Sequence, residues 1–134
     1  MYLKHFALTH FPFEHTLAPD ALFGSAALAE ARVRLHHLIE LRGMGLLTGE
    51  PGSGKTTLTR HVAAALHPGL YRLVYVPLST GNVMDMYKCI AWELGLPAER
   101  NRASAFRQIR AEVSRLLIEG KQRPVVIIDE AHHL

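Results

Sequence analysis

The stretch from Gly49 to Thr56 reads GEPGSGKT and matches the pattern G-x-x-x-x-G-K-[ST] at every fixed position. Its glycines allow the main chain to turn where side chains would clash, so that successive N–H groups can point into one concave nest. Such a nest favours a phosphate group, and a helix that begins near Lys55 would add the positive end of its dipole. The stretch is therefore a predicted phosphate-binding loop.

The side chains of this loop have separate expected roles. Lys55 would reach the β- and γ-phosphates of a nucleotide as a point charge, and the Thr56 hydroxyl would ligate Mg²⁺. A glycine-rich turn that matches only by coincidence is the alternative, but the apolar run before the loop and the helical pattern after it disfavour that reading. The predicted nucleotide-binding residues are Gly49, Glu50, Pro51, Gly52, Ser53, Gly54, Lys55, Thr56 and Thr57.

The last ten residues, VVIIDEAHHL, contain a second chemical signal. Asp129 follows an apolar run that predicts a buried strand, and ligands bind at the carboxyl ends of strands in open α/β sheets. We expect Asp129 to hold Mg²⁺ and Glu130 to orient and deprotonate an attacking water. Capping of a helix that begins near Ala131 is the structural alternative for both carboxylates. The expected catalytic residues are Glu130 and Lys55, the expected metal ligands are Thr56 and Asp129, and the expected cofactors are ATP and Mg²⁺.

Strands and helices are predicted to alternate around these two motifs. The expected strands cover 44–47, 71–76 and 125–128, and the expected helices begin at the caps Ser25, Asn82 and Ser104 and at the end of the glycine loop. This alternation predicts an α/β fold with a parallel sheet flanked by helices. The predicted inward-facing residues of the last two helices are Val83, Met86, Tyr87, Ile90, Ala91 and Leu94, then Phe106, Ile109, Val113, Leu116 and Leu117. Trp92 lies off the apolar face, where either an interface or packing against the N-terminal residues would explain it.

The composition limits the kind of protein to which the chain can belong. The chain has 134 residues, of which 49% are hydrophobic and 20% charged, as in a globular protein of one domain at most. The single cysteine, Cys89, excludes an internal disulfide and fits a reducing compartment, so we expect a cytoplasmic location. No apolar run approaches the roughly 20 residues of a membrane span. His5, His10 and His15 recur every five residues without a nearby cysteine, so zinc is not expected.

Basic residues are concentrated in one part of the chain. Residues 100–123 contain seven basic and two acidic side chains, although the net charge of the whole chain is only +3. Clustered Lys and Arg on one face suit a nucleic-acid backbone, and Arg107 and Arg110 are the candidate DNA contacts. A solvated helix face is the alternative.

Several stretches together resemble a known family. The form GxPGxGKT, followed by a hydrophobic strand ending in DE, is similar to the AAA+ ATPases. FALTHFPF, LFGSAALAEARVRLHHLI, GLLTGEPGSGKTTLTR and VVIIDEAHHL resemble the ExeA/GspA-type ATPases, which are related to transposition helper ATPases of the TniB kind. The resemblance implies ATP hydrolysis, self-association, and a partner that is either a secretion apparatus or a transposase on DNA.

The resemblance also implies a domain plan. Residues 1–24 would form an N-terminal arm, from which Phe13, Leu22 and Phe23 are candidates to pack on the adenine. Residues 25–134 would be the N-terminal portion of an AAA+ domain whose sheet has the order 5-1-4-3-2. On this plan the central strand, the sensor residue, the arginine finger and the helical lid are expected to follow Leu134. The first and third strands would then either pair directly or leave a gap, and the 134 residues alone would be marginally stable with little turnover.

Two other functions remain open. The letters DEAH suggest a helicase, but Glu50-Pro51 departs from the usual helicase loop and no arginine-bearing helicase motif is evident between the loop and Asp129. A nucleotide-dependent DNA- or protein-binding switch with little turnover is the stronger alternative.

Overall fold

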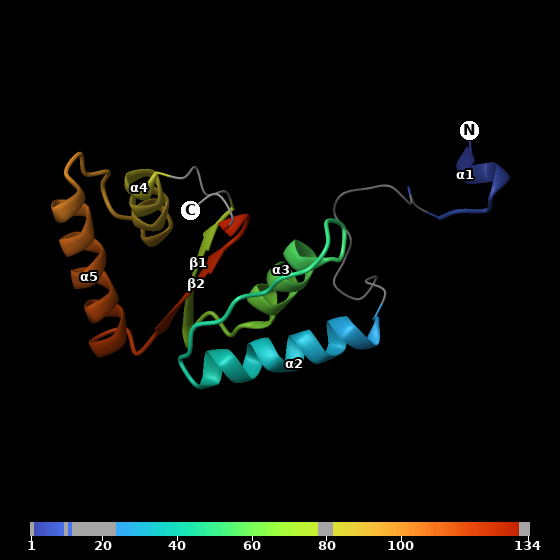
Figure 1. Cartoon of the computed structure of the whole chain (residues 1–134), viewed down its shortest axis with the longest axis horizontal. Helices are drawn as coiled ribbons and strands as arrows, with labels where there is room; N and C mark the ends of the chain where they lie inside the picture. The colour runs from blue at the N-terminus through green and yellow to red at the C-terminus, as the bar shows by residue number, and fades with distance from the viewer. Residues whose placement is uncertain (1, 10, 12–23, 78–81, 132–134) are drawn as a thin grey trace.

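The computed structural model describes residues 2–9, 11, 24–77 and 82–131. In chain order the elements are α1 (Tyr2–His5), α2 (Ala26–Glu40), α3 (Lys55–Ala65), β1 (Tyr71–Val76), α4 (Val83–Leu94), α5 (Arg102–Ile118) and β2 (Arg123–Ile128). Helices α4 and α5 lie on one side of the two strands, and α2 and α3 lie on the other (Figure 1). The expected parallel sheet between helices is therefore confirmed for these strands.

The two strands pair in parallel, from Tyr71 opposite Arg123 to Val76 opposite Ile128. Because successive side chains of a strand point to opposite faces, Val74 and Val76 share one face while Tyr75 shares the other with its partner Ile127. Val74 and Val76 are fully buried. The register therefore assigns Val74 and Val76 to the core and Tyr75 to the opposite face.

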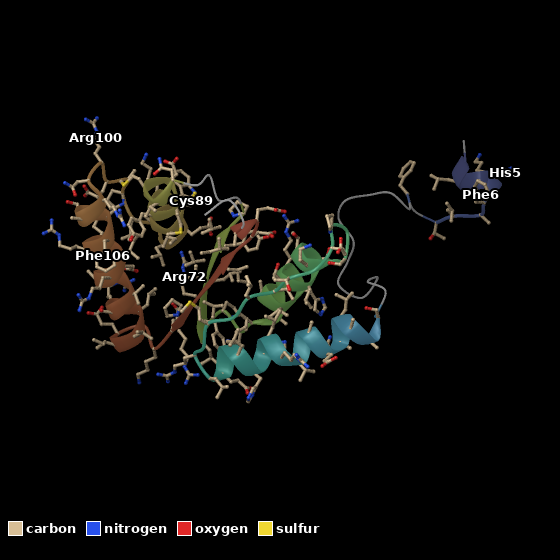
Figure 2. All side chains as sticks on the ribbon, viewed as in Figure 1. His5, Phe6, Arg72, Cys89, Arg100 and Phe106 are labelled. Carbon is tan, nitrogen blue, oxygen red and sulfur yellow. The ribbon has the colours of Figure 1, made fainter. Side chains whose placement is uncertain are left out.

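The core lies between the sheet and helices α4 and α5. Val74, Leu94 and Leu116 form its centre, and Ile90, Leu96 and Ile109 pack around them partly buried. On the same side Arg72 extends from β1 and donates a hydrogen bond of 2.7 Å to the main-chain oxygen of Glu93 near the end of α4 (Figure 2). A carbonyl in the last turn of a helix has no partner within the helix, so this bond joins β1 to α4.

Two residues of α5 that were expected to face inward do not. Phe106 is 50% exposed and Leu117 is 47% exposed, whereas their neighbours Ala105 and Leu116 are buried. The small Ala105 allows a close approach at this position, and Phe106 instead lies at the side of the helix pair, where its ring centroid is 6.4 Å from that of Tyr87. Trp92 is 80% exposed, in agreement with its predicted position off the apolar face of α4.

Helix caps explain most of the helix boundaries. The Ser25 hydroxyl accepts from Leu28 N–H at 3.2 Å and the Asn82 side chain accepts from Met84 N–H at 2.9 Å, so both predicted caps are confirmed. The prediction for α5 was wrong by a few residues, because its cap is Asn101, whose side chain accepts from the N–H groups of Ala103 and Ser104.

The segment 44–47 is not a strand, contrary to the sequence prediction. Met44 is 99% exposed and Leu46 is 82% exposed. The start of the segment lies against α2. The Leu38 side chain of α2 is so close to Gly43 and Gly45 that a Cβ atom at either glycine would press against it. Within the described residues the sheet contains β1 and β2 alone, so no neighbouring strand stabilises an extended segment here. The direct pairing of the expected first and third strands is not observed, because the first strand is not formed.

Several sequence predictions concern residues outside the described ranges: His10, Phe13, His15, Leu22 and Phe23. Of the expected irregular arm, residues 2–5 form the short helix α1, and the His5 and Phe6 rings meet edge to face with centroids 4.8 Å apart (Figure 2). None of the helices in the described parts is both long enough and apolar enough to cross a membrane.

Candidate nucleotide-binding site

The glycine-rich loop adopts a conformation that needs glycine. Gly52 and Gly54 have φ values of 78° and 88°, in the left-handed region that side chains disfavour. Ser53 N–H donates to the main-chain oxygen of Glu50 at 3.1 Å, which closes a turn within the loop. A Cβ atom at Gly49 would lie 2.9 Å from the Ser53 Oγ, so this glycine permits a close approach.

The loop leads directly into helix α3. Gly54 is the N-cap of α3 and contributes no side-chain hydrogen bond, so the first N–H groups of the helix are not capped by its N-cap residue. Uncapped N–H groups and the positive helix dipole together favour an anion at this end. Leu28 of α2 lies behind the turn, with its Cδ2 at 3.6 Å from the position of a Cβ at Gly54.

The Lys55 ammonium lies over the loop that precedes it. Its Nζ donates to the main-chain oxygen of Gly49 at 2.9 Å and to that of Glu50 at 2.8 Å. Both bonds are exposed to solvent. The ammonium is thus held beside the glycine turns, where it could meet a phosphate.

The end of β2 meets the start of α3 at Asp129. The Asp129 Oδ2 accepts a hydrogen bond of 2.7 Å from the Tyr75 hydroxyl, and its Oδ1 accepts one of 3.0 Å from Glu130 N–H. The Thr56 side chain lies on the loop side of the same carboxylate and stabilises its charged form. The main chain is fixed as well, because Asp129 N–H donates to the Val76 oxygen at 2.8 Å. Residues that are 73 positions apart in the chain therefore share one small site.

The surroundings of Asp129 favour its charged form. Burial alone would raise the pKa of Asp129, but hydrogen bonds from Tyr75, Thr56 and the Glu130 main chain, together with the charge of Arg60, lower it below its ordinary value. The pKa of Tyr75 is raised, first by burial and then by its hydrogen bond to Asp129, against the opposing effect of Arg60. At neutral pH the site thus offers an ionised carboxylate beside a hydroxyl.

Glu130 has a strained main chain. Its φ is 51°, in the left-handed region where residues other than glycine are uncommon. The residue is exposed next to Asp129. Strained positions of this kind are concentrated at functional sites, where the surrounding structure holds them. Here the Glu130 N–H to Asp129 Oδ1 bond accompanies the strain.

These groups fit a magnesium nucleotide. Carboxylate and hydroxyl oxygens are the ligands that a hard cation such as Mg²⁺ prefers, and Asp129 and Thr56 supply them at one point. The left-handed glycines and the start of α3 provide a cradle for the phosphates. Thr57 follows on α3 and is exposed. In the described ranges no group of three or more His, Cys, Asp and Glu side chains could hold a metal ion.

The candidate DNA contacts lie elsewhere. Arg107 and Arg110 are exposed on α5, on the other side of the sheet from α3 (Figure 1). Arg100 also extends away from the body of the molecule, from the loop between α4 and α5 (Figure 2). The structure therefore separates the basic residues from the phosphate loop, and the two features cannot act on the same small ligand.

Sequence reasoning missed two neighbours of Asp129. Tyr75 was assigned only to a strand, and Arg60 was not considered. A signal was present for each: Arg60 lies four residues after Thr56 and so on the same face of α3, and Tyr75 lies on the strand that pairs with β2. The Arg60 guanidinium carbon is 5.8 Å from the centroid of the Tyr75 ring.

Comparison with known proteins agrees with this site. A protein-family model described as "AAA domain" matches residues 37–134, which include the glycine loop and both carboxylates. The General secretion pathway protein A of Aeromonas hydrophila is 34% identical over 137 residues, an alignment that covers 100% of this chain and 25% of that protein. The chain thus spans about a quarter of the length of this relative. No solved structure matches. The phosphate loop, the adjoining carboxylates and the matched domain together show that the chain belongs to the AAA family of P-loop ATPases and is similar to its ExeA/GspA type.

Proposed function

We propose that this chain binds ATP with Mg²⁺ and hydrolyses it, as part of an ExeA-like ATPase that drives the assembly or remodelling of a partner. The observation that carries the proposal is the position of Asp129, which is fixed at the end of β2 by Tyr75 and lies beside the Thr56 side chain at the start of α3. This arrangement brings the end of the phosphate loop and the acidic end of β2 together, as the binding of one magnesium nucleotide requires.

Each group has a defined task in this proposal. The N–H groups of the loop and of the start of α3 bind the β- and γ-phosphates, and Lys55 turns from the Gly49 and Glu50 oxygens toward them. Bound Mg²⁺ would supply positive charge between the phosphate oxygens, with Thr56 and Asp129 as its protein contacts. Glu130 orients the attacking water and accepts its proton, for which its exposed carboxylate is suited.

The choice of partner rests on the relative. The name of the Aeromonas hydrophila protein refers to a general secretion pathway, and this supports a secretion apparatus as the partner. The location that we propose is the cytoplasm, at the inner face of the membrane if the whole protein serves secretion. A transposase on DNA is the other partner that we consider. Self-association of the ATPase belongs to both versions, because AAA domains commonly complete their sites with residues of a neighbouring subunit.

Nucleotide binding and turnover in the whole protein test the proposal. We expect a fluorescent ATP analogue to bind and ATP to be hydrolysed in the presence of Mg²⁺, and Lys55→Ala to abolish both. Lys88→Ala is the matched control, because Lys88 is a partly exposed lysine on α4 that pairs with Asp85 at 3.3 Å, outside the loop. Undiminished nucleotide binding by Lys55→Ala would contradict the proposal.

A binding switch with little turnover is the second candidate. The exposed Arg107 and Arg110 favour it, since in the described part of the chain neither forms an ion pair and both could contact a nucleic-acid backbone. Glu130→Gln separates the two functions. If turnover falls by about 10²–10⁴-fold and partner binding persists or tightens, nucleotide occupancy is the switch. If partner binding is lost together with turnover, hydrolysis itself drives the partner.

A further inference from the structure

We infer that Tyr75 is a positioning residue for Asp129, and that its hydroxyl fixes the orientation in which the carboxylate contributes to Mg²⁺ binding. The inference rests on the proposed function and extends it to a residue outside both sequence motifs. Tyr75 is the strongest candidate because it is the side chain of the sheet that hydrogen-bonds directly to a proposed metal ligand.

The register of the sheet explains how Tyr75 reaches Asp129. Tyr75 lies opposite Ile127, and Asp129 follows Ile127 by two residues, so all three side chains point to the same face. That face is the one toward α3, because Val74 and Val76 occupy the opposite face. The long phenol extends along the sheet and places its hydroxyl 2.7 Å from Asp129 Oδ2.

Hydrogen bonds to both oxygens determine how the carboxylate is oriented. The Tyr75 hydroxyl holds Oδ2 and Glu130 N–H holds Oδ1, so each oxygen has a fixed partner. Thr56 stabilises the charged carboxylate from the loop side. A hydroxyl has one hydrogen to donate and two lone pairs, so Thr56 can donate to Asp129 and still offer an oxygen lone pair to a cation. Loss of the Tyr75 bond would release Oδ2 and allow the carboxylate to rotate away from that arrangement.

Arg60 in turn restrains the Tyr75 ring. Its guanidinium carbon is 5.8 Å from the ring centroid, within the range of a cation–π contact. Because Arg60 is one helical turn after Thr56, the helix that carries a proposed metal ligand also carries a contact to the tyrosine. Tyr75 is therefore held by α3 at its ring and holds Asp129 by its hydroxyl.

The direct test is Tyr75→Phe in the whole protein, which removes the hydroxyl and leaves the ring. The readout is the equilibrium affinity for a fluorescent ATP analogue, first in EDTA and then during a Mg²⁺ titration, so no turnover is needed. We expect the affinity in EDTA to stay within about twofold and the Mg²⁺ concentration for half-maximal effect to rise about 10–100-fold, the usual effect of removing a residue that orients a metal ligand. Tyr71→Phe is the matched control, because Tyr71 lies four residues earlier on the same strand and face. It should titrate like the natural protein.

Two further variants keep the inference open to contradiction. In an Asp129→Asn background, Tyr75→Phe should have no additional effect on the Mg²⁺ titration, and an undiminished effect would overturn the positioning role. Arg60→Ala, which leaves the tyrosine hydroxyl in place, should raise the half-maximal Mg²⁺ concentration by a smaller factor, and it replaces Tyr75→Phe if that variant fails to fold. A Tyr75→Phe titration equal to that of Tyr71→Phe would overturn the inference alone, whereas nucleotide binding by Lys55→Ala would instead overturn the proposed function.

Discussion

The Lys55 Nζ lies 2.8 Å from the main-chain oxygen of Glu50, within the loop that is proposed to hold phosphates. A second carbonyl, that of Gly49, accepts from the same ammonium at 2.9 Å. The cation is thus held against the loop by main-chain oxygens, and a phosphate has only to replace these solvent-exposed bonds. The side chain is already close to where it is needed, which reduces the entropy lost on binding.

This arrangement predicts that Lys55 is needed for nucleotide binding but contributes little to the free energy of unfolding. A typical intramolecular hydrogen bond contributes about 0.5–1.5 kcal/mol net, and the two solvent-exposed bonds of Lys55 contribute less than this because water replaces them. We expect Lys55→Ala to change the free energy of unfolding by less than about 1 kcal/mol while nucleotide binding is lost. Chemical denaturation without nucleotide measures the first quantity. A cooperative unfolding transition that moved by several kcal/mol would show that the ammonium instead supports the fold.

For Glu130 we expect a substitution to increase the stability of the fold, in contrast to Lys55. Its φ of 51° is unfavourable for glutamate and ordinary for glycine. We expect Glu130→Gly to increase the free energy of unfolding by about 1 kcal/mol, because left-handed strain of this order is relieved, and to abolish turnover, because the carboxylate is lost. Thermal melts and ATP turnover measure the two effects. Glu119→Gly is the control, since Glu119 has an ordinary φ of −89° at the end of α5 and the same change there should destabilise.

Two adjacent leucines of α5 test which face of this helix packs into the core. Leu116 is 6% exposed and packs with Val74 and Leu94, whereas Leu117 is 47% exposed. Leu116→Ala should lower the free energy of unfolding by about 2–5 kcal/mol through lost burial and the cavity that remains. Leu117→Ala should cost less than about 1 kcal/mol. Equal losses in urea denaturation would show that the assignment of the two helix faces is wrong.

Local patterns in the sequence predict most of the elements. The high density of β-formers marks β1 from Tyr71 to Val76, and the side chains of Ser25 and Asn82 mark helix starts, because each of these signals acts over a few residues. The start of α5 was misplaced because Asn101 and Ser104 are both good caps, and the choice between them depends on how the helix packs. The same dependence explains why Phe106 and Leu117 were assigned to the wrong face.

The errors at 44–47 and at Tyr75 have a different cause. An apolar run such as Met44–Leu47 has a strand pattern, but extended backbone is stable only beside a paired strand, and pairing is not a local property. The Tyr75 bond to Asp129 joins positions 54 apart and depends on the register of β1 against β2. The motif residues were easier to predict, because the loop from Gly49 to Thr56 is continuous in sequence. Their roles remain proposals.

The basic surface of α5 gives a final prediction, which belongs to the switch function. Arg107 and Arg110 are exposed, whereas Arg115 is paired with Glu112 at 2.6 Å and is less available to a phosphate. If α5 contacts duplex DNA through both arginines, the double variant Arg107→Ala/Arg110→Ala should weaken binding and reduce the slope of log affinity against log salt by about 2, because about 0.9 counterions are released for each phosphate neutralised. Fluorescence anisotropy at several salt concentrations measures the slope. The control Arg34→Ala/Arg42→Ala removes the same charge from α2 and the residues after it, and a change of equal size there would assign the effect to net charge and not to a contact on α5.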